Sequence, residues 1–166
     1  MKALNFSYNT KLVSEKAFAD HVKLYQQYVD SFNELKSQSY NLNAVIIHEI
    51  YFKNIGPGDE KPGEKFLKCI GDYEKWRRDF CDTALAARGW CACVYDQCTD
   101  DVMNVLHDGY SAAIVNAYPL IVLDMEEHSY YADYLSDKKT YIDNFIQCLR
   151  WDIIEKRTGR LYGGEQ

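Results

Sequence analysis

The Gly-Pro-Gly run at residues 56–58 constrains the fold most, because it breaks the chain after two helical segments. The first segment begins at Ser14, a predicted N-cap, and places apolar residues at steps of three and four. The second runs from about Tyr40 to Ile55. Two successive amphipathic helices predict an antiparallel helical hairpin over residues 1–58. The apolar positions of the first helix are Phe18, Val22, Tyr25, Val29, Phe32 and Leu35.

Residues 59–166 have mixed periodicity after a charged linker at residues 59–64. We expect helix over residues 66–87 with a bend at Gly71, strands at 90–95, 102–106 and 119–123, and terminal helices at 138–149 and 151–156. The predicted fold is therefore α+β. An N-terminal hairpin (1–58) precedes an α/β domain (59–166) with a small three-stranded antiparallel sheet.

The charge balance excludes general nucleic-acid binding. The chain has 25 acidic and 19 Lys or Arg residues, a net charge of −6, and no basic run longer than a pair. Proteins that bind nucleic acid in general need a basic face. The N-terminal residues carry no apolar core of signal-peptide length, and no stretch approaches the ~20 apolar residues that span a membrane. We expect a cytoplasmic protein with no nucleic-acid or membrane partner.

Six cysteines raise the question of a disulfide framework or a zinc site. In a reducing compartment disulfides are disfavoured. The C-x-C-x4-C cluster at residues 91–98 lacks zinc-ribbon spacing and has no matching second pair. Cys91 and Cys93 fall on one side of a predicted strand, so we expect them to fill the core as small apolar residues.

The positions of the histidines are more informative. His21 and His48 lie on the two predicted helices, on sides that they share with apolar or aromatic residues. Asp124 ends the apolar strand at 119–123, and His128 follows four residues later. Burying a carboxylate is costly unless it is paired or binds a metal. Three imidazoles and a carboxylate suit iron, manganese or zinc. Each signal alone also fits a core or surface His, or a helix-capping Asp.

The segment at residues 124–134, DMEEHSYYADY, resembles the D-x-W-E-H-A-Y-Y-x-D-Y signature of the iron/manganese superoxide dismutases. Further resemblances follow in the family's order. Residues 20–29 resemble the first-helix ligand motif, one residue shorter, and residues 48–54 resemble the second motif, a His followed by an aromatic pair and Asn. Residues 88–90 and 150–152 resemble the strand beside the site and the last helix. The resemblance covers about residues 6–157.

The resemblance implies a superoxide dismutase that converts superoxide to O2 and H2O2 by one-electron cycling of one Fe or Mn ion per subunit. The ion would lie between the hairpin and the second domain. Tyr28 would be the gateway tyrosine, with Tyr25 as the alternative, and Trp90 would supply an apolar wall. The implied metal ligands are His21, His48, Asp124 and His128.

The resemblance also implies a homodimer, with a tetramer left open. Glu127 would hydrogen-bond to His128 of the partner subunit, and Tyr131 would add a contact at the same interface. Lys23 is the first candidate for a positive charge that attracts superoxide, and Lys138 is the second.

The chain departs from the family's pattern at two places. Glu126 stands where the family has Trp, either turned outward or placing negative charge near the metal. Ala44 stands where the iron enzymes have a Gln that bonds the metal-bound solvent. His107 on the predicted hairpin is the candidate for that role, and a surface His near a turn is the alternative. Iron and manganese therefore both remain open.

Three other functions compete with dismutation. The first is a catalytically inert metal-binding relative, which Glu126 and Ala44 favour. The second is another mononuclear metal enzyme that uses O2 or peroxide, although no organic-substrate pocket is evident in the sequence. The third is a zinc hydrolase, which would need an H-E-x-x-H motif. His48-Glu49 is followed by Phe52 at the position of that second His.

Overall fold

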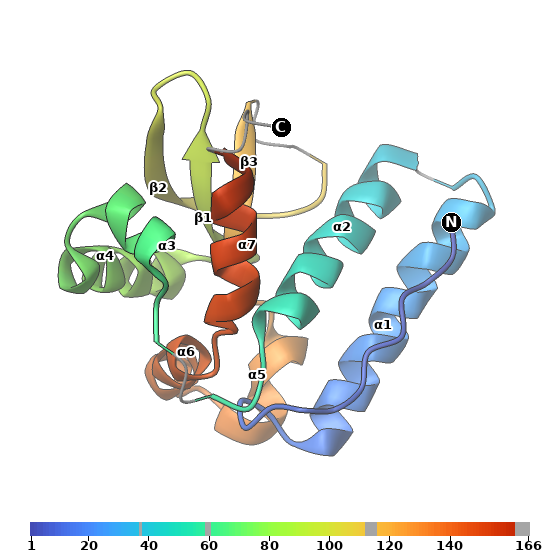
Figure 1. Cartoon of the computed structure of the whole chain (residues 1–166). Coiled ribbons are helices and arrows are strands. Elements are labelled where there is room, and N and C mark those ends of the chain that lie inside the picture. The colour runs from blue at the N-terminus through green and yellow to red at the C-terminus, as the bar shows by residue number, and fades with distance from the viewer. Residues whose placement is uncertain (37, 59–60, 112–115, 162–166) are drawn as a thin grey trace.

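The structure is a computed structural model that describes residues 1–36, 38–58, 61–111 and 116–161. The start of the predicted linker, residues 59–60, and the end of the predicted second domain, residues 162–166, lie outside the described residues. Seven helices and three strands occur in the described part, which confirms the predicted α+β class (Figure 1). In chain order they are α1 (Glu15–Asn33), α2 (Gln38–Asn54), α3 (Glu64–Ile70), α4 (Tyr73–Ala86), β1 (Trp90–Asp96), β2 (Asp101–His107), β3 (Ala117–Asp124), α5 (Glu127–Tyr134), α6 (Lys138–Gln147) and α7 (Trp151–Leu161).

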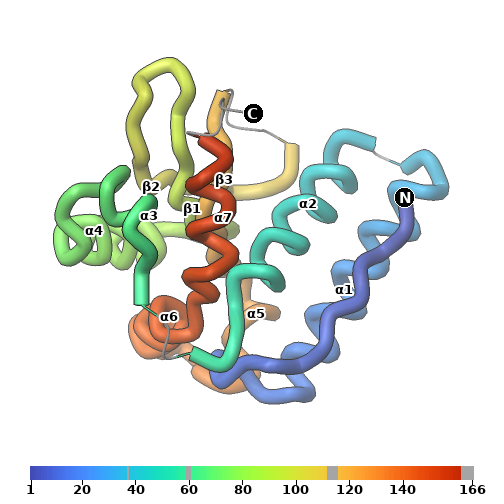
Figure 2. Tube along the Cα trace, in the orientation of Figure 1, coloured from blue at the N-terminus to red at the C-terminus, as the bar shows by residue number. Residues whose placement is uncertain are grey.

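Helices α1 and α2 form the predicted hairpin. The Ser14 hydroxyl accepts a hydrogen bond from the Ala17 amide and caps α1, which satisfies one of its free N–H groups. The N-terminal segment runs along α1 (Figure 2), where the Leu4 amide donates to the Tyr25 hydroxyl at 2.9 Å. Leu35, the last predicted apolar position, lies beyond the helix and is 81% exposed. The apolar side of α1 is therefore covered in the hairpin only as far as Val29 and Phe32.

The sheet is fully antiparallel, in the order β2-β1-β3. Trp90, the first residue of the central strand, pairs with His107 on β2 and with Asp124 on β3. Cys91 and Cys93 point toward α4, where the Trp76 indole donates to the Cys93 sulfur at 3.3 Å. Both cysteines are buried thiols, which confirms their predicted place in the core.

Helix α2 packs directly against β3, and α7 lies beside them and contacts both (Figure 1). The Arg157 guanidinium donates to the Asn54 side chain on α2 at 3.0 Å and to the Leu120 carbonyl on β3 at 2.9 Å. The Arg150 amide donates to the Asn54 carbonyl at 2.7 Å. The hairpin and the sheet thus share one core, and a division at residue 58 stays a prediction.

Within residues 1–36, 38–58, 61–111 and 116–161, no helix is both long enough and apolar enough to span a bilayer.

Candidate metal centre

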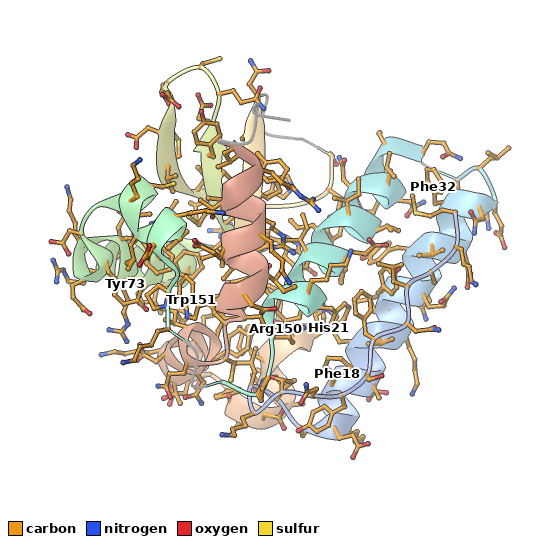
Figure 3. The ribbon with its side chains drawn as sticks, in the orientation of Figure 1. Phe18, His21, Phe32, Tyr73, Arg150 and Trp151 are labelled. Atoms are coloured by element: carbon orange, nitrogen blue, oxygen red, sulfur yellow. The ribbon has the colours of Figure 1, made fainter. Side chains whose placement is uncertain are left out.

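Two histidines enter the centre from the hairpin. His21 is 5% exposed and lies on the side of α1 that faces the rest of the molecule (Figure 3). His48 is fully buried on α2, and its ring centroid lies 5.1 Å from that of His21. The Nδ1 atom of His48 lies 2.7 Å from the Ala44 carbonyl one turn earlier. A proton on Nδ1 that donates to this carbonyl leaves the lone pair of Nε2 free.

The other two groups come from the end of β3 and the first turn of α5. Asp124 is fully buried, and its Oδ2 lies 3.1 Å from the Nε2 atoms of both His21 and His128. Its other oxygen, Oδ1, accepts a hydrogen bond from the Glu126 amide at 2.8 Å. The Asp124 carbonyl accepts from Tyr141 and Ser129, which fixes the backbone at this point.

The structure thus gathers the four residues that the resemblance implied. One ligand atom from each of His21, His48, Asp124 and His128 lies within 4.8 Å of the others. Among the residues that the structure describes, the buried Nε2 atoms of His21 and His48 have no hydrogen bond of good geometry. Orphaned buried nitrogens are rare and need an explanation. A first-row ion, with donors about 2 Å away, fits both the spacing and the chemistry of this set.

The electrostatics of the cluster favour neutral imidazoles on the hairpin and an ionised carboxylate. Burial lowers the pKa of His21 and lowers that of His48 to about 4. Burial alone would raise the pKa of Asp124, but His128 and His21 outweigh it and hold that pKa below its usual range. Lone pairs on the nitrogens and a negative charge on the oxygen are the states that bind a metal cation.

Three aromatic side chains wall the cluster. Trp90 is fully buried, with its ring centroid 4.9 Å from that of His48. Tyr28 lies 5.4 Å from His48 and 5.3 Å from Tyr110 by the same measure. Tyr110 is 2% exposed, 6.0 Å from His48, and its hydroxyl has no hydrogen-bond partner among the described residues. Tyr110 is thus a third buried aromatic residue next to His48.

Sequence reasoning missed Tyr110, because a single Tyr in a loop after Gly109 belongs to no periodic pattern. The loop is held by Asn43 on α2, whose side-chain amide donates to the Tyr110 carbonyl at 2.8 Å. Gly109 has a φ of +113°, a conformation that favours glycine, and this turn brings the next residue back to α2.

Two other predicted candidates lie away from the cluster. His107 lies on β2 and faces a hollow of about 160 Å³ that is lined mainly by apolar residues of α2 and the sheet. No ring contact joins it to the four clustered residues within the described chain. Tyr25 is buried, but its hydroxyl donates to Glu49 at 3.0 Å, on the far side of the hairpin. Of the two gateway alternatives, Tyr28 is the one beside His48.

The residues around His128 lie on α5 or directly before it. Glu126 precedes the helix and its Oε2 lies 3.5 Å from the Nδ1 of His128. Glu127 is exposed, and Tyr131 is 51% exposed.

Both predicted sources of positive charge have neighbours in the structure. Lys23 pairs with Asp20 at 2.8 Å, and Lys138 lies over the ring of Tyr130.

Known proteins with similar sequences point to the same family as the geometry of the site. Residues 60–157 match the model of the C-terminal domain of the iron/manganese superoxide dismutases. This chain belongs to the iron/manganese superoxide dismutase family. The manganese superoxide dismutase 1 of Halobacterium salinarum is 34% identical over 120 residues, which are 69% of this chain and 60% of that protein.

Relatives named for either metal are similarly close. The iron superoxide dismutase of Aquifex aeolicus is 33% identical over 154 residues, which are 87% of this chain and 71% of that protein. The manganese superoxide dismutase 2 of Haloferax volcanii is 32% identical over 132 residues, covering 76% and 66%. This chain therefore spans only about 60 to 66% of the length of the two manganese relatives.

Proposed function

We propose that this chain is a superoxide dismutase that converts superoxide into dioxygen and hydrogen peroxide. The observation that carries the proposal is the convergence of three imidazoles and one carboxylate within 4.8 Å of one another, with His21, His48 and Asp124 buried. The Nε2 of His48 has no partner among the described residues. Family membership supports the same reaction. We propose one ion of iron or manganese per subunit, held by His21, His48, Asp124 and His128.

A bound iron or manganese ion would supply the one-electron oxidation and reduction that disproportionation needs. Asp124 supplies the single negative charge among the four ligands, and the Ala44 carbonyl keeps the Nε2 of His48 free. Trp90 fills the inner wall and excludes water from that side. These residues hold the donors in place before any substrate enters.

We further propose that Tyr28 and Tyr110 control protons at the site. Burial raises the pKa of both phenols, so each keeps its proton on Oη at neutral pH. A protonated phenol can donate a hydrogen bond to a reduced oxygen species as its charge develops. Tyr110 takes the role that sequence reasoning gave to His107, because its ring lies beside His48 and Tyr28.

A catalytically inert metal-binding relative remains the second candidate function. It is favoured by Glu126, whose carboxylate lies 3.5 Å from a ring nitrogen of His128 where the family has an apolar Trp. Negative charge at that place opposes the approach of an anion.

We also propose a cytoplasmic homodimer. The exposed surface of α5 supports this assembly, because Glu127, the outer edge of His128 and Tyr131 lie there together. Light scattering on the purified protein tests it, and Tyr131→Glu is expected to weaken a dimer.

The decisive experiment measures superoxide consumption by protein loaded separately with Fe²⁺ or Mn²⁺. We expect one O2 and one H2O2 for every two superoxide ions, and loss of both metal and activity in His48→Ala and Asp124→Asn. Tyr110→Phe is expected to lower the rate more than His107→Gln does, by about 10²-fold, which is the lower end of the 10²–10⁴-fold that proton transfer contributes. Bound metal without turnover would establish the inert relative.

A further inference from the structure

The hollow of about 160 Å³ between helix α2 and the sheet has apolar walls, and its described lining includes none of the four proposed metal ligands. Ile47 and Ile50 on α2 form one side, and Val94 on β1 and Val122 on β3 form the other. An apolar cavity of about 150 Å³ in another protein stays dry and binds benzene. This apolar hollow can therefore hold a hydrocarbon group of roughly six carbon atoms.

The two polar residues in the described lining bring no charge into the apolar hollow. Asn43 already donates its side-chain amide to the Tyr110 carbonyl at 2.8 Å. Burial lowers the pKa of His107, so its imidazole is neutral at pH 7. An uncharged, mostly apolar space of this kind suits the apolar part of a ligand.

A second and larger hollow, of about 410 Å³, lies between α2 and α7. Ile46 and Ile50 line both spaces, so the two hollows adjoin. Cationic side chains dominate the charge of this second space, although the chain has a net charge of −6, and Glu49 is the one carboxylate in its described lining. The four residues that make it a cationic hollow are Lys53, Lys156, Arg157 and Arg160.

The two lysines already lie near carboxylates, whereas the two arginines have unused donors. Arg157 uses Nη1 for both Asn54 and the Leu120 carbonyl, and its Nη2 donates to no described residue. Arg160 forms no hydrogen bond or ion pair with any described residue. Burial and the nearby charge of Arg160 both lower the pKa of Arg157. An anion between the two guanidinium groups would relieve this repulsion, and carboxylates match their geometry.

We propose that the two adjoining hollows bind a small anion with an apolar tail of roughly six to eight carbon atoms. Medium-chain fatty acids are the simplest members of this class. The tail occupies the apolar hollow, and the carboxylate lies between Arg157 and Arg160. This binding site goes beyond the proposed dismutation and does not depend on it, because no proposed metal ligand is in the described lining of either hollow.

Isothermal titration calorimetry on the purified protein measures the affinity for butanoate, hexanoate and octanoate. We expect the affinity to rise about fourfold for each added CH₂ group that enters the apolar hollow. Acetate lacks the tail and 1-octanol lacks the charge, so each should bind more weakly than octanoate. Affinity that does not depend on tail length would overturn the proposal.

Two pairs of matched variants locate the binding site. Arg160→Gln should weaken octanoate binding about two- to fivefold, as for an exposed ion pair, while Arg78→Gln removes the same charge from α4 and should have no effect. Ile46→Asp places a carboxylate in the wall that both hollows share and should abolish binding. Leu85→Asp is its control, since Ile46 is 46% exposed and Leu85 is 44% exposed.

Several results would overturn this site. Unchanged octanoate affinity in a folded Ile46→Asp protein would exclude the hollows, and equal losses in Arg160→Gln and Arg78→Gln would reduce the effect to overall charge. Acetate binding as tight as octanoate binding would place the carboxylate elsewhere, as on a bound metal. Octanoate affinity that falls as the protein concentration rises would assign the hollows to a second copy of this chain. Far-UV circular dichroism of each variant separates a lost site from a lost fold.

Discussion

At the scale of single residues, the cluster depends on keeping buried imidazoles neutral. His48 has no exposed surface, and burial with help from the nearby His21 lowers its pKa to about 4, against 6.5 for an exposed His. Between these two pKa values the unfolded chain binds a proton at His48 and the folded chain does not. The linkage relation then requires stability to increase with pH across that interval.

We therefore predict that the metal-free protein loses stability as the pH falls from about 6.5 to about 4. His48 alone accounts for up to about 3 kcal/mol of the free energy of unfolding, with full stability above the unfolded pKa. The lowered pKa of His21 acts in the same direction. The raised pKa of His128 acts oppositely, because its contribution is lost as the pH rises. Urea denaturation at several pH values measures the slope, and His48→Gln should reduce it.

The four candidate ligands could be found from sequence because each combines a rare residue with a recognisable position. His21 and His48 share helix faces with apolar residues, and Asp124 ends an apolar strand. Tyr110 and the orientation of Glu126 could not be found in this way. Both depend on how a turn directs one side chain, through Gly109 in one case and the start of α5 in the other.

At the scale of elements, helix α2 matters most, since it carries His48 and must sit correctly against β3. Arg157 on α7 provides that alignment by donating to Asn54 at the end of α2 and to the Leu120 carbonyl on β3. Asn54 is fully buried, so its oxygen has no ready alternative partner. One guanidinium therefore joins α7, α2 and β3.

Replacing Arg157 with Ala should lower the free energy of unfolding by about 2–3 kcal/mol. Hydrogen bonds from a charged donor contribute about 1.5–3 kcal/mol, and two buried acceptors lose their partner. Arg160→Ala, an exposed position on the same helix, should stay within about 0.5 kcal/mol of the wild type. Urea denaturation compares the three proteins. Equal destabilisation by both variants would contradict the proposed alignment role.

Element type was predictable here, whereas element ends were less so. Periodicity located α1 and α2, and Gly71, with a φ of +69°, separates α3 from α4 at the predicted bend. Helix α7 continues to Leu161, five residues beyond its predicted end, because Ile154 and Thr158 still face the core. Tertiary burial therefore extends the helix beyond the end that periodicity predicted.

At the scale of the whole molecule, charge works against an anionic substrate. The chain has a net charge of −6, and the Glu126 carboxylate lies 3.5 Å from His128 at the proposed metal site. Lys23, the predicted source of attraction, is 73% exposed and paired with Asp20 at 2.8 Å. Of these charged groups, Glu126 therefore lies beside the proposed ligands, whereas the charge of Lys23 is paired with Asp20.

We predict that kcat/KM for superoxide increases with ionic strength, by roughly twofold between 0.01 M and 0.15 M salt, because screening weakens repulsion as the Debye length falls from about 30 to about 8 Å. Glu126→Gln should raise the low-salt rate and flatten this dependence. Glu127→Gln removes the same net charge from an exposed position. It should raise the low-salt rate and flatten the salt dependence less than Glu126→Gln does. Rates per bound metal ion, measured by stopped flow at saturating metal, keep affinity out of the comparison. A wild-type rate that falls with added salt would mean that an attractive field outweighs Glu126.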